Sequence, residues 1–330
     1  MYHELLELLK ENYIIKKDYK LELFDYKIEL NSFMSEVIMH DITTNYNKVY
    51  KIDLPRIRII IKCIVLDNKI KEDIQLMLNR FYTILNILDV NKIKYNKNKF
   101  HFVYIPTNYT KQFPTKNNTL GPYHINSGVS WIYDNKLMVW RSEECLKVFI
   151  HELFHCLGFD RFLIEKPCKL TNHYDITTHV NCNEGYNELC AFIYHNCFLI
   201  IEGFDNGLNK GLQGVHKLTI DNLIEDNKVF TYYQIKQILQ HYNLQTIAEF
   251  KQDTGVFSYF ILKGFYLYHL DELFSAIKGD TFHLFPIKSM KKFHKFEKTI
   301  LDDNAFKLFI EHLIVHTEYR PNSTLKMVLY

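Results

Sequence analysis

The stretch "KVFIHELFHCLGFDRF", which runs from Lys147 to Phe162, decides how the rest of the chain is interpreted. His151 and His155 stand four positions apart in it, so on a helix their side chains lie one turn apart on the same face. Apolar residues recur around them at helical spacing and form a separate stripe: Leu146, Phe149, Ile150, Leu153 and Leu157. The stretch therefore predicts a core helix that carries two imidazoles on a face of their own.

This histidine spacing is typical of a metal site. Residues one turn apart are about 5–6 Å from each other, so both imidazoles can direct a ring nitrogen at one ion. Glu152 is offset by one residue, where its carboxylate can take a proton from a water beside the ion. The alternative is a chance match in a chain with 16 histidines, but burying two unpaired imidazoles and a carboxylate would be costly. We therefore expect one zinc ion, held by these histidines and a third protein ligand.

Both ends of this helix can be predicted. Ser142 is a favourable N-cap residue, and Glu143 and Glu144 follow it where the helix dipole favours negative charge. Gly158 suits the left-handed position that commonly ends a helix. We expect the helix to begin at Ser142 and to stop at Gly158.

The chain before the helix indicates strands and one further long helix. Helical spacing of apolar residues predicts that helix over residues 70–88. Alternating apolar residues, and an Asp134-Asn135 turn between the last two segments, predict strands at residues 56–66, 99–107, 127–133 and 136–141.

The order of these elements predicts an α+β fold with two lobes. Residues 1–50 are expected to form a helical extension. A lobe with a small mixed sheet and the histidine helix is expected over residues 51–158, and a mostly helical lobe over residues 159–330.

"VFIHELFHCLGFD", Val148 to Asp160, resembles the active-site helix of the zincin metallopeptidases, and the strand order before it is similar to the N-terminal lobe of that family. The resemblance covers about residues 56–200. It implies a zinc-dependent peptidase in which Glu152 is the general base. It also implies that an antiparallel edge strand, either 127–133 or 136–141, pairs with an extended peptide or protein substrate.

The resemblance also bears on the third ligand, which gluzincins draw as a glutamate from a helix downstream. "NCNEGYNELCAFIYHNCF", residues 181–198, has helical periodicity and carries Glu184 and Glu188 one turn apart. Glu188 lies in "NELCA", similar to the NExxS/A form, and is the favoured ligand; Glu184 is then expected to bond a ligating histidine. Glu184 lies in "NEGY", similar to the NEGF form, so the reverse assignment is the alternative.

A third possibility is a ligand set like that of the metzincins. "HELFHCLGFDR" resembles HExxHxxGxxH through Gly158, but Arg161 occupies the last position and cannot ligate a metal. This possibility would therefore require a distant histidine such as His173 or His179.

Zincins usually add a side chain from the second lobe to stabilise the oxyanion. Residues 255–273 are predicted to form one long aromatic helix that could supply it. Tyr259 is our candidate, and the same segment also offers Tyr266, Tyr268 and His269. The competing class is a catalytically silent zincin-fold protein with a structural or interaction role, although the intact Glu152 argues against it.

Composition restricts partners and location. The chain is 47% hydrophobic and 24% charged, which is typical of a globular protein, and its net charge of +2 gives no basis for a nucleic-acid or membrane partner. Seven cysteines without a secretion signal indicate reduced thiols and a cytoplasmic protein. "VWRSEE", "HELFH" and "NEGYNE" also resemble segments of zincins from large DNA viruses, which implies the host cytoplasm or the virion.

Overall fold

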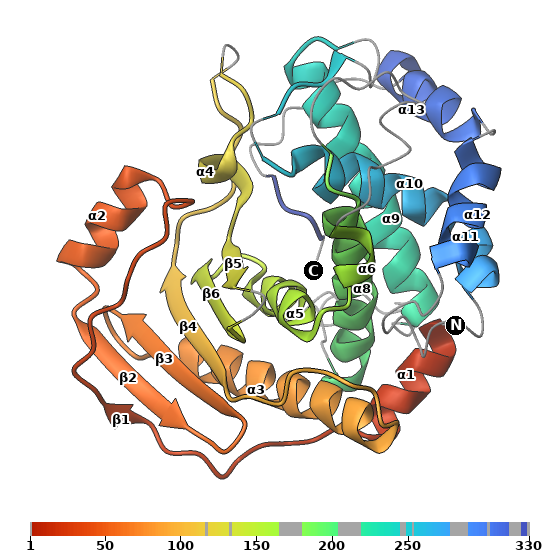
Figure 1. The fold of residues 1–330 in the computed structure, drawn as a ribbon. Coiled ribbons are helices and arrows are strands. Elements are labelled where there is room, and N and C mark those ends of the chain that lie inside the picture. Colours follow the sequence, from red (N-terminus) through yellow and green to blue (C-terminus); the bar gives the residue numbers. More distant parts are fainter. Residues whose placement is uncertain are drawn as a thin grey trace, which may run out of the picture.

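The computed structural model describes residues 2–115, 118–131, 134–164, 180–203, 219–244, 249–252, 254–277, 290–301, 304–316 and 325–328. Within these residues the chain is mixed α and β, with one six-stranded sheet beside a mostly helical half (Figure 1). The predicted α+β class is therefore confirmed.

The sheet is mixed and has the strand order β1-β2-β3-β4-β6-β5. Strands β3, β4 and β6 run parallel, whereas the outer strands β1, β2 and β5 are antiparallel to their neighbours. Strand β5 is thus an edge strand, and β6 is internal. The strands are β1 (Glu22–Leu23), β2 (Lys48–Asp53), β3 (Ile57–Cys63), β4 (Phe100–Thr107), β5 (Gly128–Trp131) and β6 (Lys136–Arg141).

Both faces of the sheet are covered by helices. On one face, Ile60, Val103 and Met138 pack with Ile38 and Ile42 of α2 (Glu36–Thr44). The other face packs against α3 (Asn68–Val90) and α5 (Cys145–Leu157), the histidine helix. This double burial explains why Ile59, Ile60 and Ile61 of β3, whose side chains point to alternate faces of the sheet, are all apolar and buried.

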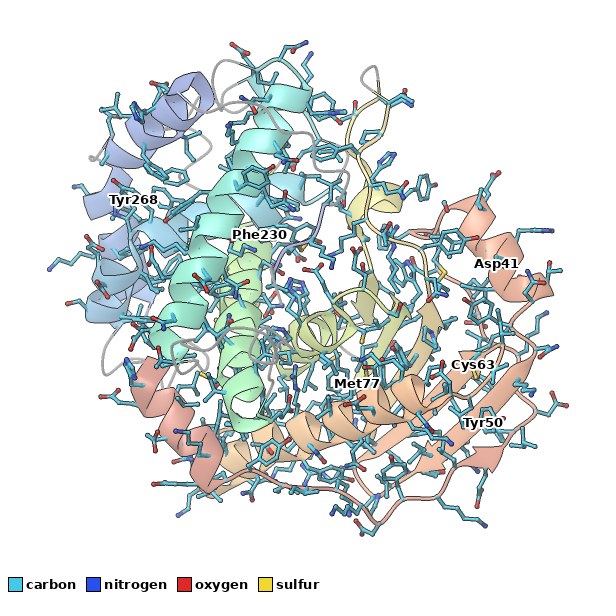
Figure 2. All side chains as sticks on the ribbon, turned by 180° about the vertical axis from the view of Figure 1, so that it is seen from behind. Asp41, Tyr50, Cys63, Met77, Phe230 and Tyr268 are labelled. Atoms are coloured by element: carbon cyan, nitrogen blue, oxygen red, sulfur yellow. The ribbon has the colours of Figure 1, made fainter. Side chains whose placement is uncertain are left out.

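The described part of the chain after α5 is mostly helical, with irregular segments at 249–252 and 325–328. Figure 2 shows Phe230 and Tyr268 among these helices, on the side of the molecule away from Tyr50 and Asp41. The remaining helices are α1 (Tyr2–Glu11), α4 (Pro122–Ile125), α6 (Arg161–Ile164), α8 (Cys182–Ile201), α9 (Ile220–His241), η3 (Phe257–Leu262), α10 (Lys263–Tyr268), α11 (Leu270–Ile277), α12 (Met290–Leu301) and α13 (Ala305–His316).

The first fifty residues differ from the predicted helical extension. Strands β1 and β2 extend the sheet from this segment, and α1 packs against α3 and α8 through Leu5, Leu6 and Leu9. The strand at 48–53 was missed because only Ile52 of β2 is fully buried, so its alternation is weak. The N-terminal segment therefore contributes both to the sheet, through β1 and β2, and to the helical half, through α1.

Helix α5 begins later than predicted. Ser142 does not cap it, because the hydroxyl of Ser142 donates to the carbonyl of Thr107 on β4. Glu144 is the N-cap residue and has a left-handed backbone with φ 57°. At the other end Gly158 has φ 75°, which confirms the predicted left-handed stop.

Two further predictions are corrected. The aromatic segment after Gly255 is not one helix: it forms a π-helical turn at η3, continues as α10 and breaks at His269. Cys182 forms a disulfide, contrary to the expectation that all thiols are reduced. The other described cysteines are free and buried, as packing residues would be: Cys63, Cys145, Cys156, Cys190 and Cys197. Among the described residues, no helix combines the length and apolarity needed to cross a membrane.

Candidate metal centre

Helices α5 and α8 lie side by side at the centre of the molecule and bring three ligand atoms together (Figure 1). Nε2 of His151 is 3.1 Å from Nε2 of His155. Oε2 of Glu184 lies 3.3 Å from each of these nitrogens. Two imidazoles and a carboxylate thus form a nearly equilateral triangle, which is close enough to hold one metal ion.

The size of this triangle matches a tetrahedral site. Ligands arranged tetrahedrally at roughly 2.0–2.1 Å from an ion are about 3.3 Å from one another. The three edges of 3.1, 3.3 and 3.3 Å meet that requirement without rearrangement. A nitrogen, nitrogen and oxygen donor set is also one that zinc uses in catalytic sites. The residues present therefore fit zinc and leave the fourth position to a non-protein ligand.

Glu188, the favoured third ligand, is not at the triangle. Its Oε2 is 3.1 Å from Nδ1 of His151, the ring nitrogen that points away from the ligand atoms. Its Oε1 pairs with the buried ammonium of Lys147 and lies 3.5 Å from that of Lys263. The geometry therefore corrects the favoured assignment and matches the alternative, in which Glu184 is the ligand and Glu188 orients a histidine. Glu184 and Glu188 are one turn apart on α8, so one contacts the Nε2 atoms of the histidines and the other contacts Nδ1 of His151.

Asp160 orients the second histidine. Nδ1 of His155 donates to its Oδ2 at 2.7 Å, and Asn183 on α8 donates to the same oxygen at 3.1 Å. Asp160 is fully buried. A carboxylate on Nδ1 turns Nε2 toward the metal and raises its basicity. No role was predicted for Asp160 from the sequence; the signal for its role is its position just after the Gly158 turn.

Side-chain contacts keep α8 in place. Asn187 donates from Nδ2 to the backbone carbonyl of His151 at 2.8 Å. Gly185 allows η3 to approach, since a Cβ there would lie 2.6 Å from a methyl of Leu262. Ala191, a small residue on the same helix, is fully buried.

Glu152 lies between the triangle and the edge strand β5. A Cβ on Gly128 would lie 2.7 Å from Oε1 of Glu152 and 2.8 Å from Val148, so a larger residue at the start of β5 would displace one of these groups. Glu152 is 7% exposed, and burial raises the pKa of its carboxyl, although His151 and His155 act in the opposite direction. A raised pKa suits a carboxylate that accepts a proton and later returns it.

The carboxylates of Glu184 and Glu188 remain ionised, because the pKa of each is lowered. Burial favours their neutral forms, but the cationic neighbours outweigh it: His155 and His151 lower the pKa of Glu184, and Lys147 and Lys263 lower that of Glu188. An ionised Glu184 is the form that binds a metal.

Tyr259 on η3 lies at the site, as the sequence analysis expected. Its ring centroid is 6.0 Å from that of His151, in an edge-on arrangement. Burial and the carboxylates Glu184, Glu152 and Glu188 raise its pKa well above 10, so the phenol keeps its proton. Of the other candidates, Tyr266 is fully buried against Phe293 and Phe296, and Tyr268 and His269 pack with Phe306 or Phe265.

A cleft runs along β5 on both sides of the site. One part is lined by Phe33, by Val129 and Ser130 of β5, and by all three triangle residues, Glu152 and Tyr259. The other part lies toward Asn126, Ser127 and the start of α5. His173 and His179, the ligands of the metzincin-like possibility, lie outside the described residues.

No family model, no curated protein and no solved structure matches the chain.

Proposed function

We propose that this protein is a zinc-dependent peptidase. The observation that carries the proposal is the triangle of His151, His155 and Glu184, whose edges of 3.1–3.3 Å match a zinc site, with a buried carboxylate beside it. A purely structural site has no need of that carboxylate, Glu152, and usually has four protein ligands.

The chain's own residues would divide the chemistry between them. Zinc, when bound, supplies the Lewis acid that activates water and polarises the scissile carbonyl. Glu152 accepts the water's proton and returns it to the leaving amine; its burial and raised pKa support this role. Tyr259, protonated and edge-on to His151, is suitably located to donate to the oxyanion.

The edge strand β5 is the proposed docking site for the substrate backbone. Its partner β6 occupies one side only, so its outer backbone groups can pair with an extended peptide. An antiparallel peptide would run from the Trp131 end toward Gly128. Its N-terminal part would then lie by Val129 and Ser130, and its C-terminal part by Asn126 and Ser127.

The test is the replacement Glu152→Gln in the zinc-loaded protein. We expect one zinc per chain to be retained and cleavage to fall by at least about 100-fold, because general-base catalysis contributes about 10²–10⁴-fold. Cleavage would be measured on heat-denatured casein and serum albumin by mass spectrometry of new N-termini. Glu225→Gln, at a side chain that is 65% exposed, is the matched control.

The outcomes separate the two classes of protein. Cleavage by the wild-type and Glu225→Gln proteins, but not by Glu152→Gln, supports the peptidase. A zinc-loaded wild-type protein that cleaves nothing, and a Glu152→Gln variant with unchanged stability and zinc content, would instead support a silent scaffold.

A further inference from the structure

A cluster of buried lysines lies beside the proposed metal centre, at the start of α5. Lys147 is one turn before His151 and pairs with Glu188, while Lys111 pairs with Glu144. Lys263 of α10 lies 3.5 Å from Glu188. All three lysine side chains are at most 1% exposed. We call Lys111, Lys147 and Lys263 the lysine cluster.

The charges around this cluster do not balance within the described part of the chain. When all three lysines are protonated, they face two buried carboxylates, Glu144 and Glu188, which leaves an excess of one positive charge. The nearby Arg141 and Glu143 do not change the excess, because their opposite charges compensate each other. A buried, uncompensated charge is costly, so the site is suited to a monoanion that supplies the missing negative charge.

The lysine cluster has hydrogen-bond donors to offer. An ammonium group has three donors. Among the described residues, Lys111 Nζ bonds only Glu144, and Lys147 Nζ bonds Glu188 and, weakly, the sulfur of Met327 at 3.5 Å. Ser127 is 3% exposed, and its hydroxyl has no partner within the described part of the chain. These unused donors suit a carboxylate, which accepts several hydrogen bonds.

The donors meet the catalytic groups in one pocket. Lys111, Lys147 and Ser127 line the same pocket as His151, Glu152 and Glu188. Met327 forms a further wall. A group bound there therefore lies beside Glu152. For a substrate antiparallel to β5, this is the C-terminal side of the scissile bond.

We propose that this pocket binds a carboxylate of the substrate on the leaving-group side of the scissile bond. The inference rests on the proposed peptidase function and narrows its substrate class. The carboxylate is either the C-terminus of the peptide or the side chain of an acidic residue that follows the cleaved bond. An excess of one positive charge favours such a monoanion over a phosphate dianion.

The first test measures binding, not turnover. Isothermal titration calorimetry of the zinc-loaded protein would compare the affinities of the monohydroxamates of succinate, glutarate and adipate with those of the corresponding terminal amides. The hydroxamate group binds the metal, and the three chain lengths place the carboxylate at three distances from it. We expect the best carboxylate to bind at least about 10-fold more tightly than its amide, as for a hydrogen bond to a buried charged group.

Equal binding within each pair overturns the carboxylate pocket and leaves the peptidase proposal intact. Failure of every hydroxamate to bind contradicts the metal centre, and with it both proposals. The comparison depends on the ligands alone, so it needs no variant to fold.

Variants then locate the preference. Lys111→Met should remove the preference for the carboxylate without weakening the amide, whereas Lys97→Met, at a side chain that is 67% exposed, should retain it. Lys111 is the safer site, because Lys147 also supports Glu188 next to His151. A folded Lys111→Met protein that keeps the full preference would contradict the assignment.

Cleavage of matched peptides distinguishes the two sources of the carboxylate. One pair differs in a free or amidated C-terminus; the other is capped at both ends and has Glu or Gln after the cleaved bond. If amidation of the C-terminus lowers kcat/KM by about 10-fold or more, the enzyme releases C-terminal residues. If replacement of Glu by Gln lowers it by as much, the enzyme cleaves before acidic residues. Equal cleavage in both pairs overturns the inference.

Discussion

Nδ1 of His155 donates to Oδ2 of Asp160 at 2.7 Å, although the two residues belong to different turns of the chain. The left-handed Gly158 reverses the backbone after α5 and returns Asp160 beneath the ring. Glu188 has the corresponding position at Nδ1 of His151, 3.1 Å away. Each imidazole thus has a buried carboxylate at Nδ1 and turns its Nε2 toward Oε2 of Glu184, which prepares the pair for a metal.

Asp160→Asn should weaken zinc binding by about 10–100-fold, because loss of a hydrogen-bond partner behind a ligating histidine has this effect. Competition with a fluorescent zinc chelator would measure the affinity. Asp53→Asn, in an exposed ion pair with Arg58, is the control and should bind zinc as the wild type does. An unchanged affinity in Asp160→Asn would show that His155 is held by packing alone.

Glu184→Gln and Glu188→Gln should have different effects, the first mainly on zinc binding and the second mainly on the stability of the fold. Glu184→Gln removes a ligand and should abolish stoichiometric zinc binding at micromolar concentration, with little effect on the stability of the metal-free protein. Glu188→Gln leaves Lys147 and Lys263 without their carboxylate and should lower the free energy of unfolding by about 3–5 kcal/mol. Metal analysis and urea unfolding would separate the two. The opposite pattern would restore Glu188 as the ligand.

Gly128→Ala should impair cleavage and leave zinc content unchanged. The added methyl would lie 2.7 Å from Oε1 of Glu152, so either the base or β5 must move. Displacements of this size cost about 100-fold in rate. The measurement is kcat/KM together with metal analysis. Gly203→Ala is the control: no atom lies within 4 Å, but the left-handed backbone (φ 64°) strains an alanine, so this variant gives an upper limit on the general cost of losing a glycine and should retain activity. Full activity in Gly128→Ala would remove Gly128 from the site.

The stability of the protein should depend on Lys263 in a pH-dependent way. Burial lowers the pKa of Lys263 to about 8, despite the favourable charge of Glu188, whereas an unfolded lysine titrates near pH 10.4. Between these values the unfolded chain binds more protons, so this residue's contribution to the free energy of unfolding rises with pH. The wild-type value minus that of Lys263→Met should increase by about 2 kcal/mol between pH 7.5 and 9.5.

Urea unfolding at four pH values would measure this difference, and Lys97→Met should show no such trend because its ammonium is exposed. A difference that stays constant across the range would mean that the Lys263 ammonium keeps its proton throughout.

Much of the sheet and of the histidine helix was predictable, because both have a short repeat in the sequence. The alternation at 56–66 and 99–107 became β3 and β4, and the helical spacing at 70–88 became α3. Where burial is incomplete, as in β2, or where the backbone departs from a regular helix, as at η3, the repeat is weak and the prediction was wrong.

Sequence alone determined that His151, Glu152 and His155 share one helix, since their spacing is fixed by the helical repeat. It could not choose between Glu184 and Glu188, which are one turn apart on the same face of α8. Only the packing of α8 on α5 decided that Glu184 meets both Nε2 atoms while Glu188 meets Lys147. The lysine cluster has the same origin: its members come from three distant segments, and only tertiary contacts bring their charges together.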